Sequence, residues 1–164
     1  MPDSNKHHSH SQSDHKDKSA VNSNTGENAM LAAQTARENL AKVTAGKVWK
    51  HTAPRGEREI KGSFELNDQL LFMLRFSPAD GSLLPVGLHG LNQGTAETMA
   101  IVQERLKQLC SELVVLDGAE FREPECCWAI PIAHQGRIVA HIKVSADGAS
   151  VIPDYKAADE LRKS

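Results

Sequence analysis

The sequence contains few cysteines and few aromatic residues, no long apolar run and no excess of one charge. Three cysteines among 164 residues cannot form a closed disulfide framework. No stretch approaches the roughly 18 consecutive apolar residues of a membrane-spanning helix, so we expect no integral membrane contact. The 19 Lys and Arg against 21 Asp and Glu give a formal net charge of −2, which provides no reason to expect a nucleic-acid partner.

Strong catalytic motifs are also missing. Gly87, Gly90 and Gly94 precede a predicted helix, but the lysine of a P-loop and the spacing of a dinucleotide fingerprint are absent. An anion cradle and a flexible connection both explain the glycines, and we favour the flexible connection. No spacing of acidic residues picks out a general acid and base. His89 is the residue of this loop that we single out as a functional candidate.

Composition changes after residue 26. Residues 1–26 contain three apolar side chains, six serines, three asparagines and four histidines. Such a segment buries too little apolar surface to offset the entropy of ordering its backbone, about 1–2 kcal/mol per residue. We therefore predict a disordered leader. Because polar residues follow Met1, the leader lacks the apolar region of a signal peptide, and we expect a cytoplasmic protein.

Half of the eight histidines lie in this leader. His7, His8 and His10 form one short run, and His15 follows. Neutral imidazoles bind Ni, Cu and Zn well, and a flexible segment can wrap around an ion without strain. We therefore predict a divalent-metal site (Ni, Cu or Zn) on the leader. The alternative is a solvated low-complexity tail that has no metal role.

Two segments have helical periodicity. The first runs from about Glu27 to Ala45, with apolar residues on one face, and Gly46 is expected to end it. The second runs from about Ala96 to Glu112, and Thr95 is its expected N-cap.

Short runs bounded by turn residues predict strands between and after these helices. They are Lys47–Thr52, Glu59–Leu66, Leu70–Ser77, Ser82–Val86, Leu113–Leu116, Phe121–Glu123, Cys126–Ala133, Arg137–Ser145 and Ser150–Ile152. Asn67 and Asp68 are expected to form a tight hairpin turn. The segment 78–81 predicts a type I turn in which Gly81 has a positive φ.

The last predicted hairpin has two distinct faces. If residues 135–136 form a two-residue turn, Ile130 pairs with His141. One face is then almost entirely apolar and is expected to pack under a helix: Cys127, Ala129, Ile138, Ala140, Ile142 and Val144. The opposite face places Trp128 beside His141 and Lys143. We expect this face to contact a protein partner or a small ligand, the alternative being an ordinary half-exposed sheet surface.

The adjacent Cys126 and Cys127 invite a metal or redox interpretation. Neighbouring strand residues point to opposite faces, so the two sulfur atoms cannot bind one ion from a strand. The Cys-x2-4-Cys spacing of a zinc site is also absent. We therefore expect structural roles, with Cys127 in the core, Cys110 on a helix beside it and Cys126 exposed.

The two halves of the chain resemble each other. Residues 36–40 match 102–106, and residues 76–85 match 144–153 in the same order. Asp-Gly turns are common enough for coincidence to remain an alternative, but two ordered matches favour a duplicated α-β-β-β unit. A helix, then Gly46-Lys47-Val48 opening a strand, a hairpin and an Asp-Gly turn followed by Ser82-Leu83-Leu84 resembles a PepSY-like unit.

This resemblance covers about residues 30–90 and, more loosely, 95–156. It implies a cystatin-like fold, in which a helix is held against a curled antiparallel sheet. It implies no catalytic residues. Modules of this family tend to act as inhibitory, chaperoning or ligand-contacting units, usually outside the cytoplasm.

We therefore predict an α+β protein made of two similar helix-plus-antiparallel-sheet units. The first is expected over 27–90 and the second over 91–164, as two domains or one merged domain. The favoured function is a non-enzymatic binding or regulatory module that contacts a protein, a second copy of itself or a small ligand. The alternatives are a metal-handling accessory protein that uses the leader, and a small enzyme with a polar pocket between the units, around His89 and His141.

Overall fold

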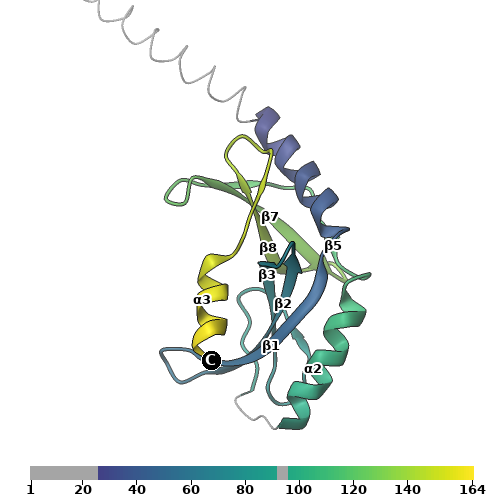
Figure 1. Ribbon diagram of the computed structural model, residues 1–164, viewed down its shortest axis with the longest axis vertical. Helices are drawn as coiled ribbons and strands as arrows, with labels where there is room; N and C mark the ends of the chain where they lie inside the picture. The colour runs from purple at the N-terminus through teal and green to yellow at the C-terminus, as the bar shows by residue number, and fades with distance from the viewer. Residues whose placement is uncertain (1–25, 92–95) are drawn as a thin grey trace, which may run out of the picture.

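The structure is a computed structural model that describes residues 26–91 and 96–164 (Figure 1). The predictions for the leader, including its histidines, and for the Thr95 cap lie outside these residues. The fold is α+β, as predicted. The described elements are a helix over 26–40, β1 (Thr44–Thr52), β2 (Arg58–Leu66), β3 (Gln69–Phe76), β4 (Leu83–Leu84), α2 (Ala96–Leu109), β5 (Val114–Val115), β6 (Glu120–Arg122), β7 (Cys127–His134), β8 (Arg137–Ser145), β9 (Val151–Ile152) and α3 (Tyr155–Lys163).

The strands form two antiparallel sheets with the same internal order. The first sheet has the order β1-β2-β3-β4, and the second has the order β5-β7-β8-β9 with β6 also paired to β7. In each sheet a long hairpin is followed by a turn and a two-residue strand on the hairpin's outer edge. The sequence repeat therefore corresponds to a repeated structural unit.

The two Asp-Gly turns have matching hydrogen bonds. In the turns at 77–82 and 145–150, the N–H of the first residue donates to the carbonyl of the last at 2.8 Å in both cases. The aspartate of each turn accepts a backbone N–H two residues further on at 3.0 Å. Gly81 and Gly148 have φ values of 73° and 77°, which glycine adopts without steric cost. The prediction for Gly81 is confirmed.

The helix of each unit packs against the other unit. Thr35, on the helix 26–40, donates its hydroxyl to the carbonyl of Gly148 in the second unit at 2.6 Å. Conversely, α2 lies on the first sheet, where a Cβ at Gly62 would come within 2.6 Å of Leu106 Cδ1. Figure 1 shows the same exchange, with α2 beside β1 and the N-terminal helix at the opposite end.

This exchange produces one shared core. A single cluster of buried apolar side chains contains residues of both sheets and of both exchanged helices. Phe64 and Phe72 stack within it, with ring centroids 5.1 Å apart. Its largest fully buried side chains are Phe64, Phe72, Phe76, Ile60, Leu74, Leu106, Leu109, Ile130, Ile132 and Ile142.

The C-terminal helix α3 is not among the sequence predictions. Its nine residues span only about two and a half turns, which is too short for apolar periodicity to predict a helix clearly. Asp154 is its N-cap and accepts the N–H of Ala157 at 3.0 Å. Ala157 packs with Trp49 and Leu70 in a second, smaller apolar cluster on the first sheet.

Both predicted helices are too long at their C-terminal ends. The first ends at residue 40 rather than Ala45, because Thr44 and Ala45 pair with β2 instead. The second ends at Leu109 rather than Glu112. Helical periodicity alone does not reveal where pairing with a strand becomes more favourable.

The β7–β8 hairpin has a different register from the predicted one. Its turn forms as expected, since Gln135 and Gly136 both have positive φ and His134 pairs with Arg137. A bulge between Ile132 and Ala133 then shifts the pairing, so that Ile130 lies opposite Ile142. The prediction that Ile130 pairs with His141 is therefore wrong.

The bulge changes which side chains face the core. Trp128 now pairs with Val144 and lies in the core with 4 % of its surface exposed. Pro131 pairs with His141, and Ala129 pairs with Lys143, on the opposite face. Trp128 therefore does not share a face with His141 and Lys143, contrary to the prediction. No helix within the described ranges is long and apolar enough to cross a membrane.

Candidate metal site on the outer face of the first sheet

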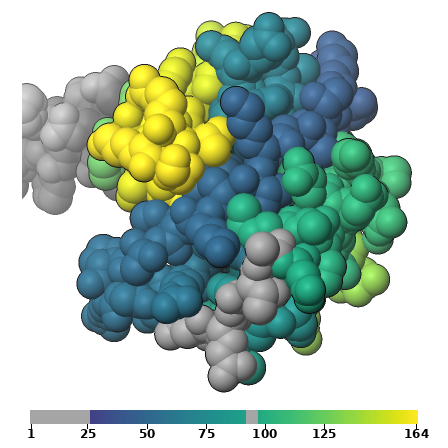
Figure 2. Space-filling model, turned by 60° about the horizontal axis from the view of Figure 1, so that its bottom comes forward, coloured from purple at the N-terminus to yellow at the C-terminus, as the bar shows by residue number. Residues whose placement is uncertain are grey.

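The first sheet lies between two helices. The face that we call its outer face is turned away from α2 and is partly covered by α3. Figure 2 shows the blue residues of this sheet between yellow α3 and green α2. The register places Trp49 opposite Lys61, and His51 opposite Glu59. His51, Glu59 and Lys61 therefore lie together on the outer face.

A cluster of two carboxylates and one imidazole lies at the edge of this face. Glu57 ends the β1–β2 turn, Glu59 is the second residue of β2, and His89 comes from the loop after β4. His89 Nδ1 lies 3.4 Å from Glu57 Oε2 and 3.8 Å from Glu59 Oε1. Donor atoms of all three residues lie within 4.8 Å of one another. We call these three residues the Glu57–Glu59–His89 cluster.

Arg75 of β3 connects this cluster to the loop that carries His89. Its Nη1 atom lies 3.5 Å from Glu59 Oε1. Its Nη2 atom donates to the carbonyls of Pro85 and Leu88, both at 2.9 Å. The Glu59 side chain is only 9 % exposed, and a carboxylate so buried needs a nearby positive charge. Arg75 therefore supplies that charge and holds the loop against the sheet.

Gly90 brings the loop close to the sheet. A Cβ at this position would lie 2.6 Å from Ser77 Oγ and 2.9 Å from Ser77 Cα, so only glycine fits. The loop is also bonded to the second unit, because the N–H of Val86 donates to the Ile138 carbonyl at 2.8 Å. These contacts fix His89 beside the carboxylates, while 57 % of its side chain stays exposed to solvent.

A second polar cluster lies next to α3. Glu160 Oε1 accepts Lys61 Nζ at 2.8 Å and Trp49 Nε1 at 3.0 Å, and lies 3.4 Å from His51 Nδ1. Burial raises the pKa of Glu160, but the hydrogen bonds from Lys61 and Trp49 and the nearby charges lower it by more. The pKa of Glu160 therefore lies below its ordinary value. This cluster attaches α3 to the sheet.

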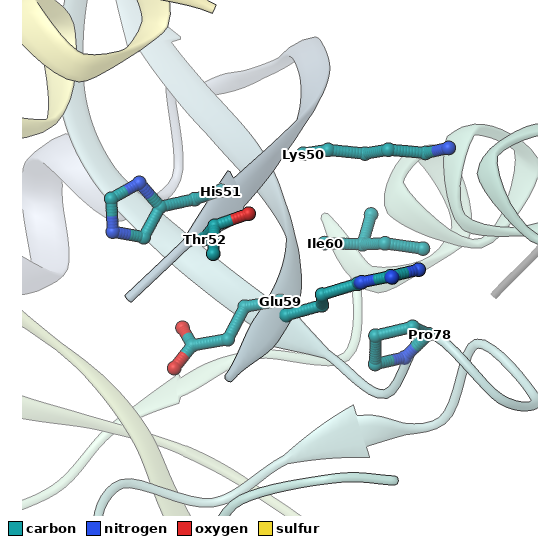
Figure 3. A pocket seen from close by; sticks show the side chains of 7 residues that line it. Lys50, His51, Thr52, Glu59, Ile60 and Pro78 are labelled. Atoms are coloured by element: carbon teal, nitrogen blue, oxygen red, sulfur yellow. The ribbon is translucent and has the colours of Figure 1, made fainter. Parts of the chain in front are cut away.

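The opposite side of the same hairpin has a different character. Figure 3 shows His51 and Glu59 pointing to one side of the β1–β2 ribbon, and Lys50, Ile60 and Pro78 to the other. Residues of the hairpin and Pro78 line a hollow of about 250 Å³. Glu59 and His51 are also among the lining residues, so the carboxylate cluster adjoins this hollow.

The donor geometry of the Glu57–Glu59–His89 cluster fits a metal ion. Ligand atoms at about 2.0–2.2 Å from one tetrahedral ion lie about 3.4 Å from one another. The separations of 3.4 and 3.8 Å from His89 Nδ1 to the two carboxylates approach this spacing, and all three donor atoms lie within 4.8 Å of one another. Imidazole and carboxylate together form a donor set that suits Zn²⁺ and other first-row divalent ions.

Sequence reasoning singled out His89 but missed its two partners. Glu57 and Glu59 are two residues apart where a strand begins, and this spacing places both side chains on one face. That signal was present in the sequence. No signal in the sequence indicated that these carboxylates contact His89, because His89 lies in a distant loop whose path depends on Arg75 and Gly90.

The remaining candidate residues have other surroundings. Burial and the charge of Arg122 lower the pKa of His141, while Glu120 opposes this. Lys143 pairs with Glu125 at 3.0 Å. Since His89 contacts Glu57 and Glu59 instead, the contacts within the described residues do not bring His89 and His141 together. Contact of a partner with the face of His141 and Lys143 stays a prediction.

Comparison with protein-family models, with curated proteins and with solved structures found no match. The PepSY-like resemblance therefore stays a prediction.

Proposed function

We propose that this protein is a non-enzymatic binding module that holds a divalent transition-metal ion at the Glu57–Glu59–His89 cluster. The observation that carries this proposal is the convergence of three donor atoms, from a turn, a strand and a separate loop, within 4.8 Å. Two further observations support the proposal. The Glu59 carboxylate is buried, and the loop of His89 is held in place by two hydrogen bonds from Arg75 and by the close contact of Gly90.

The donor set favours a transition metal over Ca²⁺ or Mg²⁺. Those hard cations prefer oxygen ligands throughout, whereas imidazole is a good ligand for Zn, Ni, Cu and Fe. The exposed ring of His89 offers the ion a path from solvent. Arg75 neutralises part of the carboxylate charge, so we expect moderate rather than very tight binding.

The test is calorimetric titration of the full-length protein with ZnCl₂ and NiCl₂. Because the leader is itself a predicted metal site, the starting variant replaces His7, His8, His10 and His15 with Ser. This variant is expected to keep one binding site. Adding His89→Ala or Glu59→Gln should weaken that site by more than about tenfold, the lower end of the cost of losing even an outer-shell partner.

His141→Ala is the matched control, since it removes a histidine that lies outside the cluster. It should leave the affinity unchanged. Equal affinities in the His89→Ala variant and its parent would overturn the proposal. Loss of all binding in the leader variant would instead assign metal binding to the leader alone.

A further inference from the structure

A polar cavity of about 390 Å³ lies where the two units meet. Ser82 and Pro85 line it from the first unit, Arg105 from α2, and His134, Gln135 and Arg137 from the β7–β8 hairpin. Its size falls within the range of about 300–1,000 Å³ that is usual for small-molecule sites. The cavity is separate from the Glu57–Glu59–His89 cluster, with which it shares no lining residue.

Two guanidinium groups in this cavity lack partners. The Nε atom of Arg105 is buried and has no hydrogen-bond partner. Within residues 26–91 and 96–164, neither Arg105 nor Arg137 forms an ion pair. A buried donor without a partner is costly, typically about 1–3 kcal/mol, and calls for an explanation.

Two acidic side chains contact residues of the cavity wall, Asp80 at Ser82 and Glu112 at His134, and both are engaged there. Glu112 Oε1 lies 3.0 Å from His134 Nε2, and this contact fixes the imidazole at the cavity wall. The His134 side chain is 8 % exposed, whereas that of Glu112 is 49 % exposed. Glu112 therefore pairs with His134 and not with either arginine.

We propose that this cavity binds an oxyanion group, a phosphate or a carboxylate, carried by a small molecule. The planar guanidinium group presents a fork of N–H donors that matches both oxyanions. Gln135 adds an amide that can donate to the rest of the ligand, whereas the hydroxyl of Ser82 already donates to Asp80 Oδ1 at 2.7 Å. The ligand supplies the partner that Arg105 lacks.

A ligand in this position contacts both units at once. Its binding energy therefore adds to the stability of the native arrangement, because only the folded state brings Arg105 and Arg137 together. This makes the cavity a place where a small anion strengthens the contact between the exchanged halves.

The test is titration of the full-length protein with inorganic phosphate and, in a second arm, with citrate. Metal-free buffer keeps the cluster of the first sheet out of the measurement. We expect saturable binding of at least one anion and a rise in melting temperature that saturates with it. Comparison of the two arms identifies phosphate or carboxylate as the preferred group.

Arg137→Gln and Arg105→Gln should each weaken binding at least tenfold. Arg137 is exposed, so its replacement tests the site without disturbing the core. Arg55→Gln removes the same charge in the β1–β2 turn and should leave binding unchanged. His89→Ala should also have no effect, which separates this proposal from the metal site. Absence of binding by both anions, or equal affinity in the Arg137→Gln variant, would overturn it.

Discussion

Burial divides the three cysteines into two kinds. Cys127 is buried, and burial followed by the contact with Glu125 raises the pKa of its thiol. Burial also raises the pKa of Cys110. Cys126 is exposed in the turn before β7, where its φ is 52°. The predicted positions of Cys127 in the core and Cys126 at the surface are confirmed.

This difference predicts one reactive thiol. Because the thiolate is the nucleophile, buried Cys127 and half-buried Cys110, whose pKa values are both raised, should react slowly with a thiol reagent at pH 8. Cys126 should react fast. A spectrophotometric thiol assay of the native protein should show one rapid equivalent, which Cys126→Ser removes and Cys127→Ser leaves. Two rapid equivalents in the native protein would contradict the assignment.

Among the secondary-structure elements, the two exchanged helices approach the glycines of the two Asp-Gly turns to different extents. An added Cβ at Gly148 would lie 2.7 Å from the Asn28 carbonyl oxygen, a backbone atom of the N-terminal helix. An added Cβ at Gly81 would lie 3.2 Å from Ile101 Cγ2, at the end of a side chain that can move. The two φ values are nearly equal, so backbone strain affects both positions alike.

Gly148→Ala should therefore destabilise the protein more than Gly81→Ala. We expect a difference of about 1–3 kcal/mol in the free energy of unfolding, the usual cost of overpacking. Urea titrations followed by circular dichroism measure both values. Equal losses would show that the N-terminal helix does not depend on close contact with the second unit.

The attachment of α3 predicts a pH-dependent contribution to stability. The pKa of Glu160 is lowered in the folded state, so its contribution is present above the ordinary value of about 4.3 and is lost as pH falls through the folded-state pKa. Glu160→Gln should cost about 1 kcal/mol at pH 7, the scale of one hydrogen bond. The difference from the native protein should shrink towards pH 3.

Asp159→Asn is the control for this experiment. Asp159 lies next to Glu160 but, among the residues that the structure describes, pairs with Arg162 and Lys163 on the exposed side of the same helix. Exposed pairs contribute little to stability, so this variant should unfold at nearly the native urea concentration at pH 7. A loss equal to that of Glu160→Gln would attribute the effect to the helix rather than to its contact with Trp49 and Lys61.

For the whole molecule, the shared core predicts a single unfolding transition. Trp49 lies on the first sheet and Trp128 in the second, and both are buried. In Trp49→Phe the remaining fluorescence reports on the second unit, and in Trp128→Phe it reports on the first. Within each variant, the fluorescence midpoint in urea should equal the circular dichroism midpoint. Separate midpoints would show that the units unfold independently.

Local sequence patterns predicted most helices and strands correctly, but they did not predict which side chains of β7 and β8 face the core. The alternation of β7 and β8 was evident, yet one bulge at Ile132 reversed the placement of Trp128. A single unpaired residue leaves no clear mark in the sequence but exchanges the two faces of a strand. The predicted contact face therefore lost its aromatic residue to the core.

The candidate site was predictable only in part for the same reason. His89 stood out as a histidine in a glycine-rich loop, and Glu57 and Glu59 lie two residues apart where β2 begins. Their meeting depends on the loop after β4, which Arg75 and Gly90 hold against the sheet. Contacts between distant segments of the chain have no periodicity that a sequence displays.

The amino-acid sequence determines the turns, the approximate helices and the duplicated order of strands, because these depend on interactions between residues near one another in the chain. Asn67 and Asp68 form the predicted hairpin turn, with positive φ at both residues. The exchange of helices, the attachment of α3 and the convergence of the Glu57–Glu59–His89 cluster arise only in the folded molecule. They depend on which apolar faces bury one another, and this pairing of faces is determined by the total apolar surface that the shared core removes from water.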